Sequence, residues 1–191
     1  MSSHEVMALV TEALRDQLRA VLPPESALII GPPSPSVHSA PGVFVNLFRI
    51  AVSNSNRNRL QPVDRTPDGS MLAPPLCLEL DYLIAGLGAQ ALTELALLDG
   101  VLQFVNDSSM QTHDMLEESL FYLGRRSLLS QGKLSLRWLL LDLPLDQLSG
   151  VWVASGLPQR AGVIVRGEVV WQVNSGPAIA TKIESIRPVS E

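Results

Sequence analysis

The strongest alternation of hydrophobic and polar positions lies between residues 133 and 175, and it predicts a strand, a short helix and a second strand. From residue 134 to 141 apolar side chains occupy every second position and some of the positions between, which indicates a strand covered on both faces. Residues 144–155 have an apolar stripe at helical spacing, formed by Leu145, Leu148, Val151 and Trp152. Residues 163–173 alternate again, with valines and a tryptophan on one face and polar residues largely on the other.

Upstream of this unit, the patterns predict two further helices and three further strands. The first helix begins near residue 6, and its apolar stripe consists of Val6, Leu9, Val10, Ala13, Leu14, Leu18 and Val21. Strands are expected at residues 27–30, 43–52 and 76–84. The second helix follows at residues 90–105, with an apolar side formed by Leu92, Leu95, Ala96, Leu98, Leu102 and Val105. The sequence therefore predicts an α/β fold, a single domain in which a mixed sheet of about five strands packs against helices.

The composition indicates that part of the apolar surface contacts other subunits. Of the 191 residues, 46% are hydrophobic and only 17% are charged, below the usual quarter or so. We therefore expect part of the aliphatic surface to be covered by other subunits. The formal net charge of −5 argues against a nucleic-acid partner, because proteins that bind nucleic acids present a basic face.

The cysteine count and the N-terminal sequence predict the cellular compartment of the protein. Cys77 is the only cysteine, so no intrachain disulfide forms, and no partner pattern makes this thiol a nucleophile. The first residues lack the pattern of a signal peptide, and no apolar run approaches the ~20 residues of a membrane span. We expect a cytosolic product with no direct membrane insertion.

One glycine-rich motif is a candidate for binding chemistry. The segment Gly86–Ala91 (GLGAQA) fits G-x-G-x-x-A between a strand and a helix, the arrangement that places a pyrophosphate at a helix N-terminus. Against it, Glu79 and Asp81 interrupt the strand, and no second strand ending in a ribose-binding acid follows the helix. A turn explains the glycines as well. A small dinucleotide-binding enzyme is the alternative hypothesis.

No other motif points to catalysis. The three histidines, His4, His38 and His113, stand far apart, and the sequence has no HExxH zinc motif, phosphate-binding loop or nucleophile elbow. We therefore predict no catalytic, cofactor-binding or metal-binding residue, and a protein that is not an enzyme.

Several of these segments, taken in order, resemble one family. The run LPLDQLSGVW, then LPQR and a long valine-rich strand, is similar to a signature of the tail-terminator or cap proteins of extracellular contractile injection systems, formerly a domain of unknown function. The helix VTEALRDQLRAVLPP, the strand VFVNLFRIAVSNSNRNRL and the segment PPLCLELDYLIAGLG precede it in the order of that family. Within the motif, Leu148, Trp152 and Pro158 are expected to be packing residues.

The resemblance implies a structural role in a phage tail-like particle. It implies a homo-hexameric ring that ends the inner tube and the sheath and controls tail length, with the inner tube protein and the sheath protein as partners and no cofactor. A phage-like tail-completion or connector protein is the second structural hypothesis. The cap domain is expected over residues 1–175 and a C-terminal arm over residues 176–191. Assembly is expected in the cytoplasm, for a particle that is then released or anchored.

Partner contacts are harder to place from the sequence. Two pairs of arginines are the candidates for an acidic neighbour, Arg57 and Arg59 in a predicted turn, and Arg125 and Arg126 in a segment whose pattern leaves one helix or two short pieces open. The C-terminal arm fits either an addition to a neighbouring subunit's sheet edge or a frayed tail.

Overall fold

The computed structural model describes residues 5–32, 41–53, 75–88, 90–107, 132–155 and 159–173, which form one mixed α/β domain. Its helices and strands have the following bounds: α1 (Val6–Val21), β1 (Ala27–Ile30), β2 (Gly42–Val52), β3 (Leu76–Leu87), α3 (Ala91–Asp107), β4 (Gly132–Leu141), α6 (Leu145–Ser155) and β5 (Gly162–Val173). The expected fold class is confirmed. No helix among these residues is long and apolar enough to cross a membrane.

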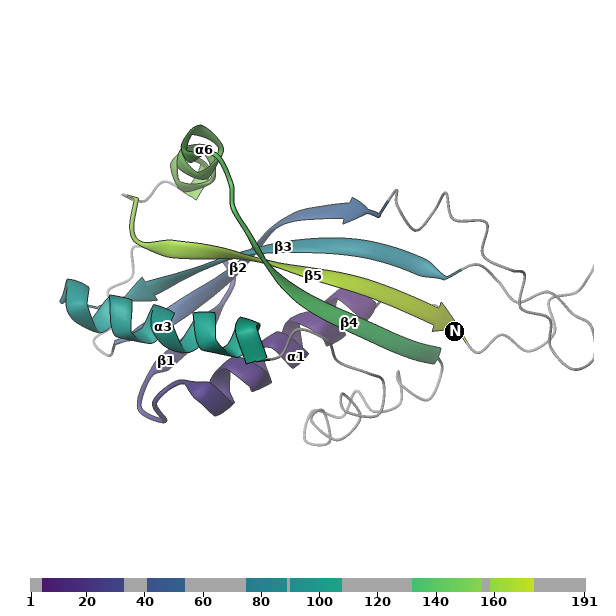
Figure 1. Cartoon of the computed structure of the whole chain (residues 1–191), viewed down its shortest axis with the longest axis horizontal. Helices are drawn as coiled ribbons and strands as arrows, with labels where there is room; N and C mark the ends of the chain where they lie inside the picture. Colours follow the sequence, from purple (N-terminus) through teal and green to yellow (C-terminus); the bar gives the residue numbers. More distant parts are fainter. Residues whose placement is uncertain are drawn as a thin grey trace, which may run out of the picture.

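The five strands form one curled sheet in the order β1-β2-β3-β5-β4 (Figure 1). Only β1 and β2 are parallel, while β3 is antiparallel to both β2 and β5, and β5 is antiparallel to β4. The short β1 pairs with residues 42–45 of β2, and β4 lies at the opposite edge. The sheet is therefore mixed, as predicted, with most pairs antiparallel.

Helices α1 and α3 cover one face of the sheet, which we call the α1–α3 face (Figure 1). The predicted stripe of α1 is buried there, except that Val21 is exposed. Two polar contacts fix α1 on the sheet: the Thr11 hydroxyl lies 2.9 Å from the Tyr82 hydroxyl, and Trp138 Nε1 donates to Gln17 Oε1 at 3.0 Å. Burial raises the pKa of Tyr82 to about 12.

Helix α6 lies on the opposite face, the α6 face, and covers only the end where β2 and β5 begin (Figure 1). Trp152 is buried here, with its ring 5.7 Å from that of Phe44 in an edge-on arrangement. Leu148 is half-buried against the same cluster. Leu145, predicted in this stripe, is 71% exposed, so the prediction was wrong for this first-turn residue.

The orientation of α3 also differs from the prediction. Its buried residues are Leu97, Leu98, Val101, Phe104 and Val105, whereas Leu92, Leu95 and Leu102 are exposed. The helix is apolar almost all around, so periodicity alone does not select its buried side. Contacts at its N-terminal end select the side instead, because Glu94 pairs with Arg160 and lies directly against Gly86.

Candidate functional site

A cluster of charged side chains occupies the half of the α6 face that α6 leaves uncovered. At its centre is Asp81 of β3, which is only 2% exposed. Arg166 of β5 donates to it twice, from Nε to Oδ1 at 2.7 Å and from Nη2 to Oδ2 at 3.0 Å. Arg49 of β2 donates from Nη1 to Oδ2 at 2.9 Å. The buried carboxylate is therefore compensated by two guanidinium groups from its two neighbouring strands.

A bulge in β2 places Arg49 in this cluster. The pairing of β2 with β3 shifts by one residue between Leu47 and Arg49. Without the shift, Phe48 would face Asp81 and Arg49 would point to the apolar α1–α3 face, because successive side chains alternate between faces. The bulge therefore rotates Arg49 toward the carboxylate.

Further ion pairs extend the cluster across β3, β5 and β4. Arg166 Nη1 lies 3.1 Å from Glu79 Oε2, and Arg137 of β4 lies 4.0 Å from Glu168 of β5. The hydrogen bond to Asp81 is the main cause that raises the pKa of Arg166 above its ordinary value. Three arginines thus face three carboxylates, so the cluster neutralises itself and joins four strands. It has neither a nucleophile nor an acid–base pair.

The thiol of Cys77 lies on the same face and is buried. Burial raises its pKa, and its sulfur lies 3.9 Å from the Pro75 carbonyl oxygen. A protonated, buried thiol is a poor nucleophile, which agrees with the expectation of a passive cysteine.

The glycine-rich motif does not form a dinucleotide site. Gly86 belongs to β3, which is antiparallel to both of its neighbours, so β3 lacks the adjacent parallel strand of the βαβ unit that the motif requires. A β-carbon at Gly86 would lie 2.8 Å from Cβ of Glu94, so this glycine allows α3 to pack closely on the strand. The alternative hypothesis of a dinucleotide-binding enzyme loses its structural basis.

The other residues singled out from the sequence have different positions. Leu148 and Trp152 pack under α6 as described above. The four candidate contact arginines (Arg57, Arg59, Arg125 and Arg126), the packing residue Pro158 and the three histidines lie outside the described residues. Within the described ranges, no three His, Cys, Asp or Glu side chains gather in a way that suits a metal ion.

Sequence reasoning missed the charged cluster, although part of its signal is in the sequence. Glu79 and Asp81 stand at alternate positions of an otherwise apolar strand, and Arg166 likewise stands on the polar face of the alternating strand β5. Their direct opposition depends on the strand order and on the bulge in β2, neither of which follows from periodicity.

Comparison with known proteins shows where this architecture recurs. Residues 9–177 match the model of the Pvc16 N-terminal domain family. No curated protein matches the sequence. The fold is similar to the PVC sheath/tube terminator of an extracellular contractile injection system in its extended state, with a TM-score of 0.64 and 16% identity over 100% of this chain and 67% of that one.

A second solved structure has a similar fold. It is the anti-feeding prophage cap, a tube-terminating cap, with a TM-score of 0.63 and 17% identity over 95% of this chain. The chain spans 60% of the length of that cap. At these identities the comparison establishes a shared fold.

Proposed function

Because the chain belongs to the Pvc16 N-terminal domain family, we propose that it is a structural subunit that ends the tube and sheath of a contractile injection system. The observation that supports this most is the fold similarity over 100% of the chain to a sheath/tube terminator. The proposed partners are the inner tube protein, the sheath protein and further copies of the chain. No catalytic step is part of this function.

The physical reason for such a subunit lies in how tubes grow. Stacked rings join head to tail, and this kind of interface leaves an open end that accepts another ring indefinitely. A terminator binds that end with one surface and offers no equivalent surface on the other side. We propose that the subunit does this as a ring of six copies and thereby controls tail length, and that the particle assembles in the cytoplasm.

Two structural features support an assembly role. The described residues leave several large aliphatic side chains in water, with Leu92 80% and Val153 76% exposed, which is typical of a surface that meets another protein. The charged cluster around Asp81 links four of the five strands and so favours a sheet that keeps its shape under load. We further propose that residues 1–175 are the cap domain and residues 176–191 an arm.

Electron microscopy of particles from cells with and without the gene tests the proposal. Without it, we expect tubes of widely spread length or tubes without sheath, and complementation with the wild-type gene restores one length. Particles of normal length and normal sheath in the absence of the gene would contradict it.

A biochemical measurement separates this function from its rivals. Light scattering of the purified chain is expected to give the mass of six copies, with no change on titration with a dinucleotide. A monomer that binds the dinucleotide supports the enzyme instead, and a ring that restores phage tail joining but not tail length supports the connector.

A further inference from the structure

Hydrophobic side chains are exposed at one corner of the sheet, where β4 ends between α3 and α6. This β4 corner comprises Leu102, Leu140, Leu143, Leu145, Asp142 and Asp146. Three of its leucines, Leu102, Leu140 and Leu145, are 37%, 47% and 71% exposed. Beyond these leucines, the outward side of α3 adds Leu92 and Leu95.

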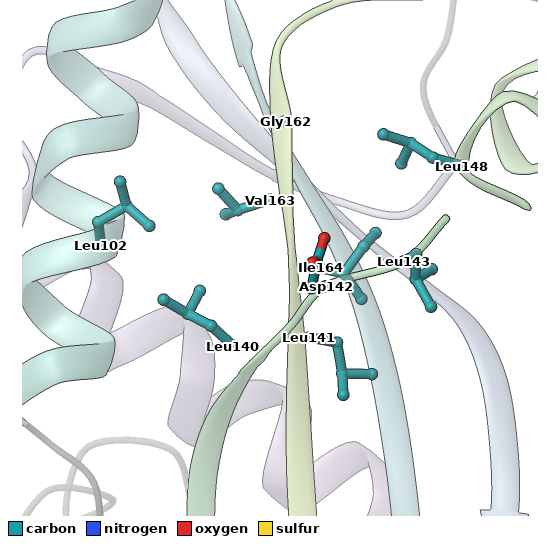
Figure 2. A pocket seen from close by; sticks show the side chains of 9 residues that line it. All are labelled: Leu102, Leu140, Leu141, Asp142, Leu143, Leu148, Gly162, Val163 and Ile164. Atoms are coloured by element: carbon teal, nitrogen blue, oxygen red, sulfur yellow. The ribbon is translucent and has the colours of Figure 1, made fainter. Parts of the chain in front are cut away.

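The β4 corner is hollowed. A hollow of about 330 Å³ is lined by residues of α3, β4, β5 and the start of α6, and Asp142 supplies the one charge among them. Figure 2 shows Leu102, Leu140 and Val163 on the α3 side of β5, with Leu143 and Leu148 on the α6 side. Because β4 pairs only with β5 in the described part of the chain, its outer edge is open beside this hollow.

The charge of the β4 corner is negative, and no described residue forms an ion pair with it. Asp142 and Asp146 are exposed, and neither forms an ion pair with a described residue, nor does Asp99 on the outer side of α3. The nearby cation Arg160 is held by Glu94. A complementary partner therefore presents aliphatic side chains next to lysine or arginine.

The chain itself contains a segment of that chemistry. Residues 178–187 (AIATKIESIR) place isoleucines at 179, 183 and 186 beside Lys182 and Arg187, and with one acid, Glu184, the segment keeps a net charge of +1. They follow β5 and lie outside the described residues. Their hydrophobic and basic residues match the aliphatic lining and the carboxylates of the β4 corner.

Distance favours the segment of another copy. β5 starts at Gly162, which lines the hollow, and ends at Val173, about 36 Å away at roughly 3.3 Å per residue. Lys182 follows Val173 by nine residues, so a fully extended chain carries it at most about 32 Å. Ile179 falls further short. Ile179 and Lys182 therefore fall short of Gly162 in their own copy. Ile183, Ile186 and Arg187 follow Val173 by 10, 13 and 14 residues, so they reach Gly162 only if the chain runs back along the sheet in a largely extended form, at roughly 2.6–3.6 Å per residue.

We propose that residues 178–187 of one copy dock on the β4 corner of a neighbouring copy, with an isoleucine in the hollow and Lys182 or Arg187 beside Asp142. This inference rests on the proposed function in one respect, because it requires adjacent copies in a ring. It assigns the β4 corner to contacts between copies of the chain, so the inner tube protein and the sheath protein bind to other surfaces of the subunit.

Cysteine cross-linking between two differently tagged versions of the full chain tests this, in a Cys77→Ala background. One version carries Asp142→Cys and the other Ile183→Cys. We expect a cross-linked heterodimer that forms at least about tenfold faster than with the control Lys133→Cys, at the far end of the same edge strand, about 30 Å from residue 142. Equal rates for the two positions overturn the proposal.

A charge exchange provides a second measurement. Here the cross-linking cysteine is moved from residue 142 to the neighbouring lining residue, as Leu143→Cys. In that background we expect Asp142→Lys to lower the heterodimer yield about tenfold and the pair Asp142→Lys with Lys182→Glu to restore it. Cross-links only within one chain that carries both cysteines, or a yield indifferent to the exchange, overturn the docking. Light scattering on the same samples tests the docking and the ring separately. A six-copy ring without the cross-link refutes the docking alone, whereas a monomer refutes the ring as well.

Discussion

Replacing Asp81 by asparagine tests whether the charged cluster stabilises the sheet. The substitution keeps the shape of the side chain but removes the negative charge that faces Arg166 and Arg49. Asparagine can still accept one hydrogen bond, while its amide group points its own donors at a guanidinium. Arg49 then loses its described counter-ion, and Arg166 keeps only the ion pair with Glu79.

The size of the effect follows from the burial of the three groups. Removing one partner of a fully buried ion pair costs about 3–5 kcal/mol. Here the carboxylate is 2% exposed but the side chains of Arg166 and Arg49 are 19% and 53% exposed, so water compensates part of the loss. We therefore expect Asp81→Asn to lower the free energy of unfolding by about 2–3 kcal/mol, which for a chain of this size lowers Tm by roughly 5–10 °C.

Urea and thermal unfolding, followed by circular dichroism at one fixed protein concentration, measure this change. The matched control is Asp99→Asn, an exposed carboxylate without a described ion pair, for which we expect a change within about 0.5 kcal/mol. A double variant, Asp81→Leu with Arg166→Met, is expected to be more stable than Asp81→Asn, because it removes both buried charges. If Asp81→Asn matches the control, the cluster is only a solvated surface feature and the reasoning is refuted.

Three further outcomes follow from the packing. Gly167→Ala places a β-carbon 2.8 Å from the ring of Trp138, so we expect it to lower the free energy of unfolding in urea by about 1–3 kcal/mol. The control Gly150→Ala, at an exposed position of α6 with no atom within 4 Å of the new β-carbon, is expected to raise it by about 0.5–1 kcal/mol. The opposite order of stabilities would contradict the packing around Gly167. Tyr82 ionises near pH 10 in the unfolded chain but near pH 12 in the folded protein, so its contribution to stability is constant below pH 10, falls by about 1.4 kcal/mol per pH unit between pH 10 and 12, and then levels off. Tyr82→Phe is expected to lack this slope in urea unfolding, and an equal slope in both proteins would exclude Tyr82 as its cause. Trp152→Ala empties the site under α6 and is expected to cost about 3–5 kcal/mol, measured by denaturant unfolding, and a loss below about 1 kcal/mol would mean that α6 is not anchored there.

The sequence predicts the sheet elements well because their alternation is strong. The unit β4–α6–β5 lies where the pattern places it, and in β5 the residues expected on one face, such as Val165 and Val169, are buried against α1 and α3. The same alternation in β3 separates Leu80 from Asp81, which lie on opposite faces. A period of two specifies faces without any knowledge of neighbours.

Features that depend on neighbouring strands did not follow from the pattern. The stripe of Leu92, Leu95 and Leu102 is as regular as the buried side of α3, yet it lies in water, because the contact of Glu94 with Gly86 fixes the rotation of the helix. The bulge at Phe48 likewise has no periodic signature, and it decides on which face Arg49 lies. The candidate site was missed for this reason.

The two halves of the described structure differ in how far their charges and apolar side chains are compensated, and the proposed contacts between subunits follow from this difference. Around Asp81 every charge has an opposite charge within reach, so a partner gains little there and must first remove water from exposed arginines. At the end of β4 the situation is reversed, because leucines are exposed, Asp142 has no described counter-ion, and no described strand pairs with the outer edge of β4. Burying aliphatic area there lowers the free energy of association with no internal ion pair to break. A subunit that must hold its own shape while binding neighbours therefore keeps its compensated charges inside the sheet and its exposed apolar surface at the sheet edge.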